Sequence, residues 1–145
     1  MTMCVILYLA TSTPLAAVAA AELTVESVPD GVLGKLRDKL SLPHVSRVLA
    51  GTCSCDFPSM LVGELMPYED WMGHSAEQRA REIGLLTALF GLVRGACCDG
   101  RGVELFPVCV GVEGEPAHGR HELRLGELDP ARFQFAENFI HAIHA

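Results

Sequence analysis

The sequence predicts a single α/β or α+β domain over residues 1–145, with a mixed β-sheet flanked by helices. Apolar or alternating segments typical of strands recur along the chain, and a long capped helix separates two of them. Half of the 145 residues are hydrophobic and 20% are charged, a composition typical of a globular chain with a sizeable core.

The first quarter of the chain predicts two strands. Residues 3–10, "MCVILYLA", form an almost continuous apolar run, which favours a strand buried on both faces. Thr13 and Pro14 are good residues to start a short helical turn over 15–21. Residues 22–28, "ELTVESV", alternate polar and apolar side chains, as a half-buried strand does.

The next stretch predicts a helix and a strand. Leu33, Leu36 and Leu40 recur at helical spacing within 32–40, and Pro43 follows soon after the expected end. Residues 44–51, "HVSRVLAG", then form a strand that leads directly into a pair of cysteines. Residues 60–66 indicate a further short strand.

The clearest helix begins after Ser75, which forms a capping box with Gln78. Its apolar positions repeat through residue 97 and predict that most of the helix is buried as a crossover between two strands. A second ridge contains only small side chains, for which packing against the sheet is the simpler interpretation and pairing with a second copy the alternative. This small-residue ridge consists of Gly84, Ala88, Gly91 and Gly95.

The last third predicts two more strands and a terminal helix. The strands cover 103–112, where Pro107 indicates an irregularity or a sheet edge, and 121–128. Asp129 and Pro130 are suitable N-cap and first-turn residues for a helix that runs to the C-terminus.

Cysteine spacing gives the main functional hypothesis. Cys53 and Cys55 are two residues apart, and on an extended segment their side chains point to the same side. Such a pair supplies two thiolates to a soft metal, with zinc the simplest choice, and the remaining ligands come from elsewhere. Cys4 and Cys109 are the next candidates, while Cys97 and Cys98 end the long helix.

Two other interpretations of the same pair remain open. A disulfide between Cys53 and Cys55 closes a small strained ring that is easily reduced, as in a thiol–disulfide or redox-sensing protein. Alternatively, both cysteines are small apolar residues in a turn and have no chemical role.

Histidines and acidic residues offer weaker candidates. On a helical C-terminus Glu137, His141 and His144 share one face, but that face is the solvent side, so surface decoration is preferred to a metal site. His118 and His121 belong to a predicted loop flanked by Gly and Pro. In "PYEDW", residues 67–71, the acids suit the start of the next helix better than a general base.

Charge and composition exclude several function classes. The net charge of −7 and the absence of a Lys/Arg cluster argue against nucleic acid and anionic membrane surfaces as partners. No hydrolase, phosphate-loop or dinucleotide motif occurs. The N-terminal apolar run is too short for a membrane span and lacks the basic start of a signal peptide. We therefore expect a cytoplasmic protein with reduced thiols.

Three motifs together carry a resemblance to a family. The segment "MCVILYLATSTPL", the C-x-C-x-F of Cys53, Cys55 and Phe57, and "YEDW" resemble a family of small uncharacterised bacterial proteins over most of the chain. That family's central motif is C-G-C-G-F, so Ser54 and Asp56 replace its glycines here.

The resemblance implies no activity. It implies that residues 3–10 are mature sequence, and it adds weight to four cysteines at positions where the family pattern also has cysteine. These are Cys4, Cys53, Cys55 and Cys109. The leading hypothesis is a small soft-metal protein, with redox function and an interaction module that dimerises through the small-residue ridge as rivals.

Overall fold

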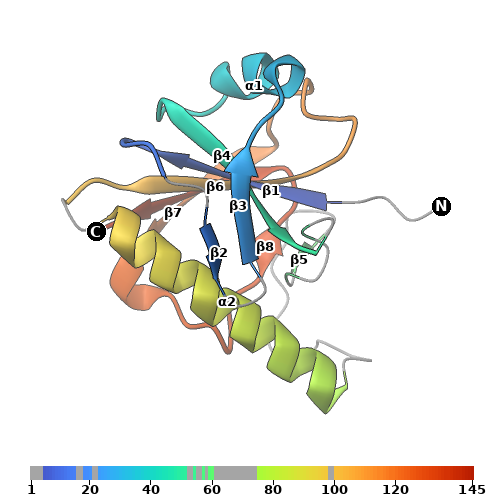
Figure 1. Cartoon of the computed structure of the whole chain (residues 1–145), viewed down its shortest axis with the longest axis vertical. Coiled ribbons are helices and arrows are strands. Elements are labelled where there is room, and N and C mark those ends of the chain that lie inside the picture. The colour runs from blue at the N-terminus through green and yellow to red at the C-terminus, as the bar shows by residue number, and fades with distance from the viewer. Residues whose placement is uncertain are drawn as a thin grey trace.

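A mixed seven-stranded sheet organises the computed structural model of the chain (Figure 1). The structure describes residues 5–15, 18–20, 23–51, 54, 57, 59–60, 75–97 and 100–145. Within these ranges the strand order is β2-β3-β4-β1-β6-β9-β7, with β7 parallel to β9 and the other pairs antiparallel. The strands are β1 (Val5–Thr11), β2 (Val18–Ala20), β3 (Leu23–Ser27), β4 (His44–Ala50), β6 (Val103–Cys109), β7 (Gly119–Arg124) and β9 (Phe139–His144).

Two short strands lie outside this sheet and pair with each other in parallel. They are β5 (Ser59–Met60) and β8 (Phe135–Ala136). This pairing holds the segment that follows the C-x-C motif beside the segment that leads into β9. Two regions far apart in the sequence are thereby joined.

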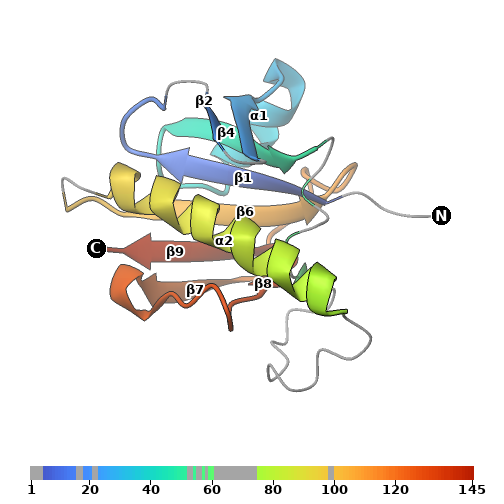
Figure 2. The same cartoon turned by 60° about the horizontal axis from the view of Figure 1, so that its bottom comes forward.

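Helix α2 (Ala76–Ala96) crosses one face of the sheet diagonally (Figure 2). The Ser75 hydroxyl accepts a hydrogen bond from the Gln78 amide at 3.0 Å, which confirms the predicted N-cap. β4 and β6 both run antiparallel to β1, so they are parallel to each other, and α2 makes the predicted crossover between them. The core on this face includes Leu7, Leu9, Leu86, Leu89, Phe90, Val93 and Leu105.

Helix α1 (Asp30–Arg37) covers the opposite face. Because side chains alternate along a strand, the neighbours of the α2-facing residues in β1 point toward α1. Tyr8 and Phe106 pack with Leu36 in this second core. All seven residues of β1 and all seven of β6 are buried, which explains why both sequences are apolar apart from Thr11 and Glu104.

The predicted fold class is confirmed, and so are the strands expected within 3–10, 22–28, 44–51, 103–112 and 121–128 and the helix expected after Ser75. The helix expected over 32–40 is also present, but it begins at Asp30 and ends at Arg37. The turn predicted over 15–21 is wrong where the structure describes it, because 18–20 form strand β2 paired with β3. Nearly all of the strand expected at 60–66 lies outside the described residues.

The terminal helix predicted from Asp129 is also wrong. Asp129 does cap a turn, since its carboxylate accepts from the Ala131 amide at 2.9 Å, but the chain then enters β8 and β9. Asn138, at φ 63°, makes the left-handed turn between these strands. Both faces of β9 are buried over Ile140–Ile143, so the sequence lacks the alternation that would have identified a strand.

Two further expectations need correction. The three glycines of the small-residue ridge do not pack against the sheet: Gly84, Gly91 and Gly95 are exposed, and a Cβ at each would meet open space, whereas Ala88 is partly buried against the core. Pro107 does not mark a sheet edge, because β6 lies between β1 and β9. The β6–β9 register nevertheless ends at Leu105, two residues before Pro107, so the irregularity is present.

Candidate functional site

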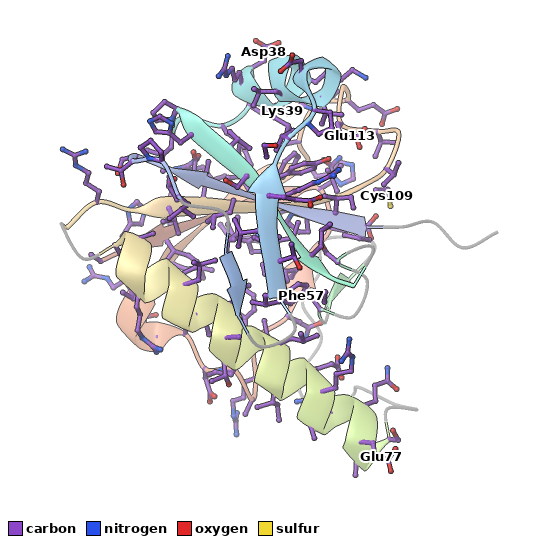
Figure 3. All side chains as sticks on the ribbon, in the orientation of Figure 1. Asp38, Lys39, Phe57, Glu77, Cys109 and Glu113 are labelled. Atoms are coloured by element: carbon purple, nitrogen blue, oxygen red, sulfur yellow. The ribbon has the colours of Figure 1, made fainter. Side chains whose placement is uncertain are left out.

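Of the four cysteines predicted to bind metal, the structure describes Cys109. It is the last residue of β6 and lies at the end of the sheet where the chain enters β1 (Figure 3). Cys4, Cys53 and Cys55 lie outside the described residues, as do Cys98, Asp56 and the "PYEDW" segment. The residues next to the three predicted ligands are described, however, and they define where the motif attaches.

Ser54, the residue between Cys53 and Cys55, is firmly anchored. Its amide donates to the Val5 carbonyl at 2.8 Å. Its hydroxyl accepts from the Leu7 amide at 2.8 Å and donates to the Val48 carbonyl at 2.5 Å. The β1–β4 register ends at the Leu7–Val48 pair, and Ser54 bridges the two strands there. Its side chain thus has a structural use that glycine in this position would not have.

Phe57 provides the second anchor of the motif. It is buried in the core beneath α2 and meets Phe135 of β8 edge-on, with ring centroids 6.1 Å apart. Its amide donates to the Ser54 carbonyl at 3.2 Å. The C-x-C-x-F segment is therefore fixed to the protein through its serine and its phenylalanine.

Cys109 lies opposite Val5 in the β1–β6 register, which brings the end of β6 to the same place. Its thiol donates to the carboxylate Oε1 of Glu137, a residue in the turn between β8 and β9. Both side chains are buried, Cys109 at 6% and Glu137 at 7% exposure. Val5, Ser54, Cys109 and Glu137 are called the sheet-end cluster below.

The second carboxylate oxygen of Glu137 is unusual. Oε2 is buried, and no described residue makes a hydrogen bond to it. Buried carboxylate oxygens in folded proteins are nearly always satisfied, because leaving one bare costs the desolvation of that group. A cation or donor at this position would remove the cost.

The sheet-end cluster offers a thiol and a carboxylate, both of them zinc ligands in other proteins. Within the described ranges, no group of three or more His, Cys, Asp or Glu side chains is arranged to hold a metal. A complete metal site at this end of the sheet therefore needs further ligands from Cys4, which precedes Val5, or from Cys53 and Cys55, which flank Ser54.

His141, predicted on a solvent-exposed helix face, is instead a core residue at 1% exposure. Its Nε2 accepts from the Ala136 amide at 3.0 Å, which requires the proton of the neutral ring to be on Nδ1. Nδ1 has no hydrogen bond of good geometry, although the carbonyls of Leu105 and Phe139 lie close enough to favour the charged ring. With one nitrogen engaged and the other protonated, His141 is not a metal ligand.

The surroundings of His141 keep its imidazole ring neutral. Burial, reinforced by the neighbouring His121, lowers the pKa of His141 to about 4. The aromatic rings of Phe133 and Phe135 meet it edge-on and contribute to the dry surroundings. This residue links β9 to β8, which in turn holds β5.

Of the other three histidine candidates, only His121 is found beside His141 among the described contacts, with ring centroids 5.5 Å apart. His121 belongs to β7 rather than to a loop, and its ring stacks on Phe139 at 4.8 Å between centroids. His118 is exposed and contacts the edge of the same phenylalanine ring. His144 points to the other face of β9 and pairs with Glu122. The convergent face of Glu137, His141 and His144 does not exist, because the segment is not a helix.

The sequence pattern did not indicate an ion pair on the α1 face between a buried carboxylate and a partly exposed arginine. Glu104 of β6 is 2% exposed, and its Oε2 accepts from Arg120 of β7 at 2.7 Å. Its Oε1 accepts from the amides of Ser41 and Leu42 at 2.8 and 3.0 Å. Glu104 thus ties the end of the α1 segment to two strands. A lone carboxylate within an apolar strand is the signal that could have revealed it.

A second polar group lies nearby, around the loop that follows β6 (Figure 3). Lys39 donates to the Glu113 carbonyl, and a Glu113 carboxylate oxygen accepts from the Gly111 amide at 3.0 Å. Burial, with the Glu113 carboxylate beside it, raises the pKa of Tyr8 to about 12. These contacts secure the loop against α1 and keep the tyrosine protonated.

An open cavity of about 440 Å³ lies between α1 and the β3–β4 edge, away from these groups. Arg37 and His44 contribute to its rim, together with apolar side chains such as Leu15 and Leu33. None of the candidate ligands lines it.

Comparison with protein-family models, with curated proteins and with solved structures finds no match to this chain. The resemblance to the small bacterial family stays a prediction. No helix in the described part of the chain is long and apolar enough to cross a membrane.

Proposed function

We propose that this protein binds one soft metal ion, most simply zinc, at the sheet-end cluster. Cys53 and Cys55 are the primary ligands, and Cys109 and Cys4 are the candidates for the remaining positions. One observation carries the proposal: Ser54 is hydrogen-bonded to Val5, and Val5 pairs with Cys109. Ser54 lies between Cys53 and Cys55 in the sequence, and it contacts Val5. Val5 in turn follows Cys4 and pairs with Cys109.

Chain geometry supports this convergence. Cys4 is next in sequence to Val5, and Cys53 and Cys55 are next to Ser54, while Cys109 itself belongs to the cluster. Neighbouring Cα atoms are about 3.8 Å apart, so this adjacency limits how far each cysteine can be from the cluster. Tetrahedral zinc requires thiolates at about 2.3 Å, a reach that short side chains from adjoining backbone segments can meet. A zinc ion here would join the start of β1, the C-x-C segment and the end of β6. The role that follows is structural, because a closed thiolate site leaves no position for substrate.

Cobalt titration of the reduced, metal-free chain tests the ligand assignment. Thiolate ligands give cobalt(II) a charge-transfer absorption in the near ultraviolet, and we expect saturation at about one equivalent in the wild type. Cys53→Ser and Cys55→Ser should abolish or severely weaken this absorption. Cys97→Ala is the matched control, since Cys97 is a buried cysteine at the C-terminal end of α2 that the proposal does not use. Equal titrations in all four proteins would contradict the assignment.

The expected partners and location follow from the same proposal. Reduced thiols imply the cytoplasm, and an acidic chain without a basic patch implies no nucleic-acid partner. The redox alternative predicts a reversible mass change of two hydrogens at Cys53 and Cys55, without metal.

The interaction-module alternative is favoured by one feature, the exposure of the three glycines of the small-residue ridge on α2. Closely packed helices need small residues at the contact, and a homodimer through this ridge would bury Gly91. Under this alternative Gly91→Leu converts a dimer to a monomer in a sedimentation experiment, and both motif cysteines tolerate serine. Under the metal proposal Gly91→Leu leaves both metal content and sedimentation unchanged.

A further inference from the structure

We propose that Glu137 is an oxygen ligand of the metal, so that the site contains three thiolates and one carboxylate, and that this carboxylate strengthens the binding of Zn²⁺ but not of Cu⁺. This inference rests on the proposed function and identifies its fourth ligand. The carboxylate would take the position otherwise left to Cys4, with Cys53, Cys55 and Cys109 as the thiolates.

The position of Glu137 supports this role. One of its carboxylate oxygens already contacts the Cys109 thiol, and the other is buried without a hydrogen-bond partner among the described residues. The side chain is 7% exposed, so water does not readily satisfy that oxygen. A cation bound to both Cys109 and Glu137 would occupy the place that the thiol proton holds and compensate the buried negative charge.

The backbone keeps Glu137 in place. The next residue, Asn138, donates its amide to the Pro107 carbonyl at 2.7 Å, and its side chain donates to the Pro116 carbonyl at 3.3 Å. On the other side, the Ala136 amide is held by His141. These bonds fix the turn beside the end of β6, so the carboxylate is positioned before any ion binds, which lowers the entropic cost of binding.

The donor set predicts that the two metals respond differently to loss of the carboxylate. Zinc accepts cysteine sulfur and carboxylate oxygen in the same tetrahedral site, at about 2.3 and 2.0 Å. Copper(I) is softer and selects thiolates, so an oxygen ligand adds little to its binding. Zinc loading also releases the Cys109 thiol proton to solvent, because the thiolate is the ligand.

Competition titrations of the full reduced chain with Zn²⁺ and with Cu⁺ test the inference. Glu137→Gln should weaken zinc binding about tenfold to a hundredfold, while copper(I) affinity stays within about threefold of the wild type. Glu82→Gln is the matched control, because Glu82 is a buried carboxylate on α2 that pairs with Arg79 and is not part of the sheet-end cluster. Unchanged zinc affinity in Glu137→Gln, or an equal loss of both metals, would overturn the assignment.

A measurement on the wild type keeps the test valid even where a variant does not fold. X-ray absorption at the zinc edge should resolve three sulfur neighbours and one oxygen. Four sulfur neighbours would identify Cys4 as the fourth ligand and refute the role of Glu137, while leaving the proposed function intact. A wild-type chain that takes up no zinc would overturn the proposed function itself, and this inference with it.

Discussion

Glu104→Ala is expected to lower the free energy of unfolding by about 2 to 4 kcal/mol. The substitution removes the acceptor for the Ser41 and Leu42 amides and the carboxylate partner of Arg120 at once. Two amides then lose their hydrogen bonds, and a cavity replaces a side chain that is 2% exposed. Because whole domains are stable by about 5 to 15 kcal/mol, the loss is a large fraction of the total.

Urea unfolding measures this effect, and Glu122→Ala is its matched control. Both carboxylates accept from Arg120 at 2.7 Å, but Glu122 is exposed on β7 and has no backbone amide to satisfy. We expect the Glu122→Ala midpoint to match the wild type. Similar midpoints for Glu104→Ala and Glu122→Ala would show that the burial of Glu104 and its bonds to the two amides do not have the importance assigned to them.

The second large effect is an acid sensitivity that depends on His141. The folded protein holds its pKa at about 4, below the ordinary value of 6.5, so only the unfolded chain takes up a proton between these values. The contribution of His141 to the free energy of unfolding is therefore fully present above about pH 7, and it decreases as the pH drops from 6.5 toward 4. By pH 4 the loss amounts to about 3 kcal/mol.

Unfolding free energies of wild type and His141→Gln, compared at pH 7 and pH 4, isolate this contribution. Glutamine retains an acceptor for the Ala136 amide but does not titrate, so the wild type should lose about 3 kcal/mol more than the variant. His144→Gln, at the exposed end of β9, should follow the wild type. Equal losses in wild type and His141→Gln would contradict the assignment of a buried neutral ring.

The elements that the sequence predicts well are those whose pattern has one interpretation. β1 and β6 are short and predominantly apolar runs, β7 alternates along its length, and α2 carries a capping box before a long apolar stripe. β9 fails this criterion because both of its faces are covered, one by the aromatic core near α2 and one by the α1 core. Its aromatic, aliphatic and histidine side chains fit either a helix or a strand.

Only part of the candidate site could be predicted from the sequence, because the site combines segments that are distant in the chain. Spacing identified the C-x-C pair, but pairing between distant strands brings Val5 to Cys109 and Ser54 to Val5. Glu137 was assigned to an exposed helix face, and its contact with Cys109 depends on a turn at Asn138 that local patterns do not reveal. Asparagine tolerates this left-handed conformation, yet asparagine alone is too weak a signal to end a helix.

The most direct test of the central claim is the zinc content per chain of protein purified without chelators and without a metal-affinity step. Binding at the sheet-end cluster predicts about one zinc per chain, retained through gel filtration and absent from Cys53→Ser. Wild-type protein that contains no zinc and takes none up when reduced would contradict the claim.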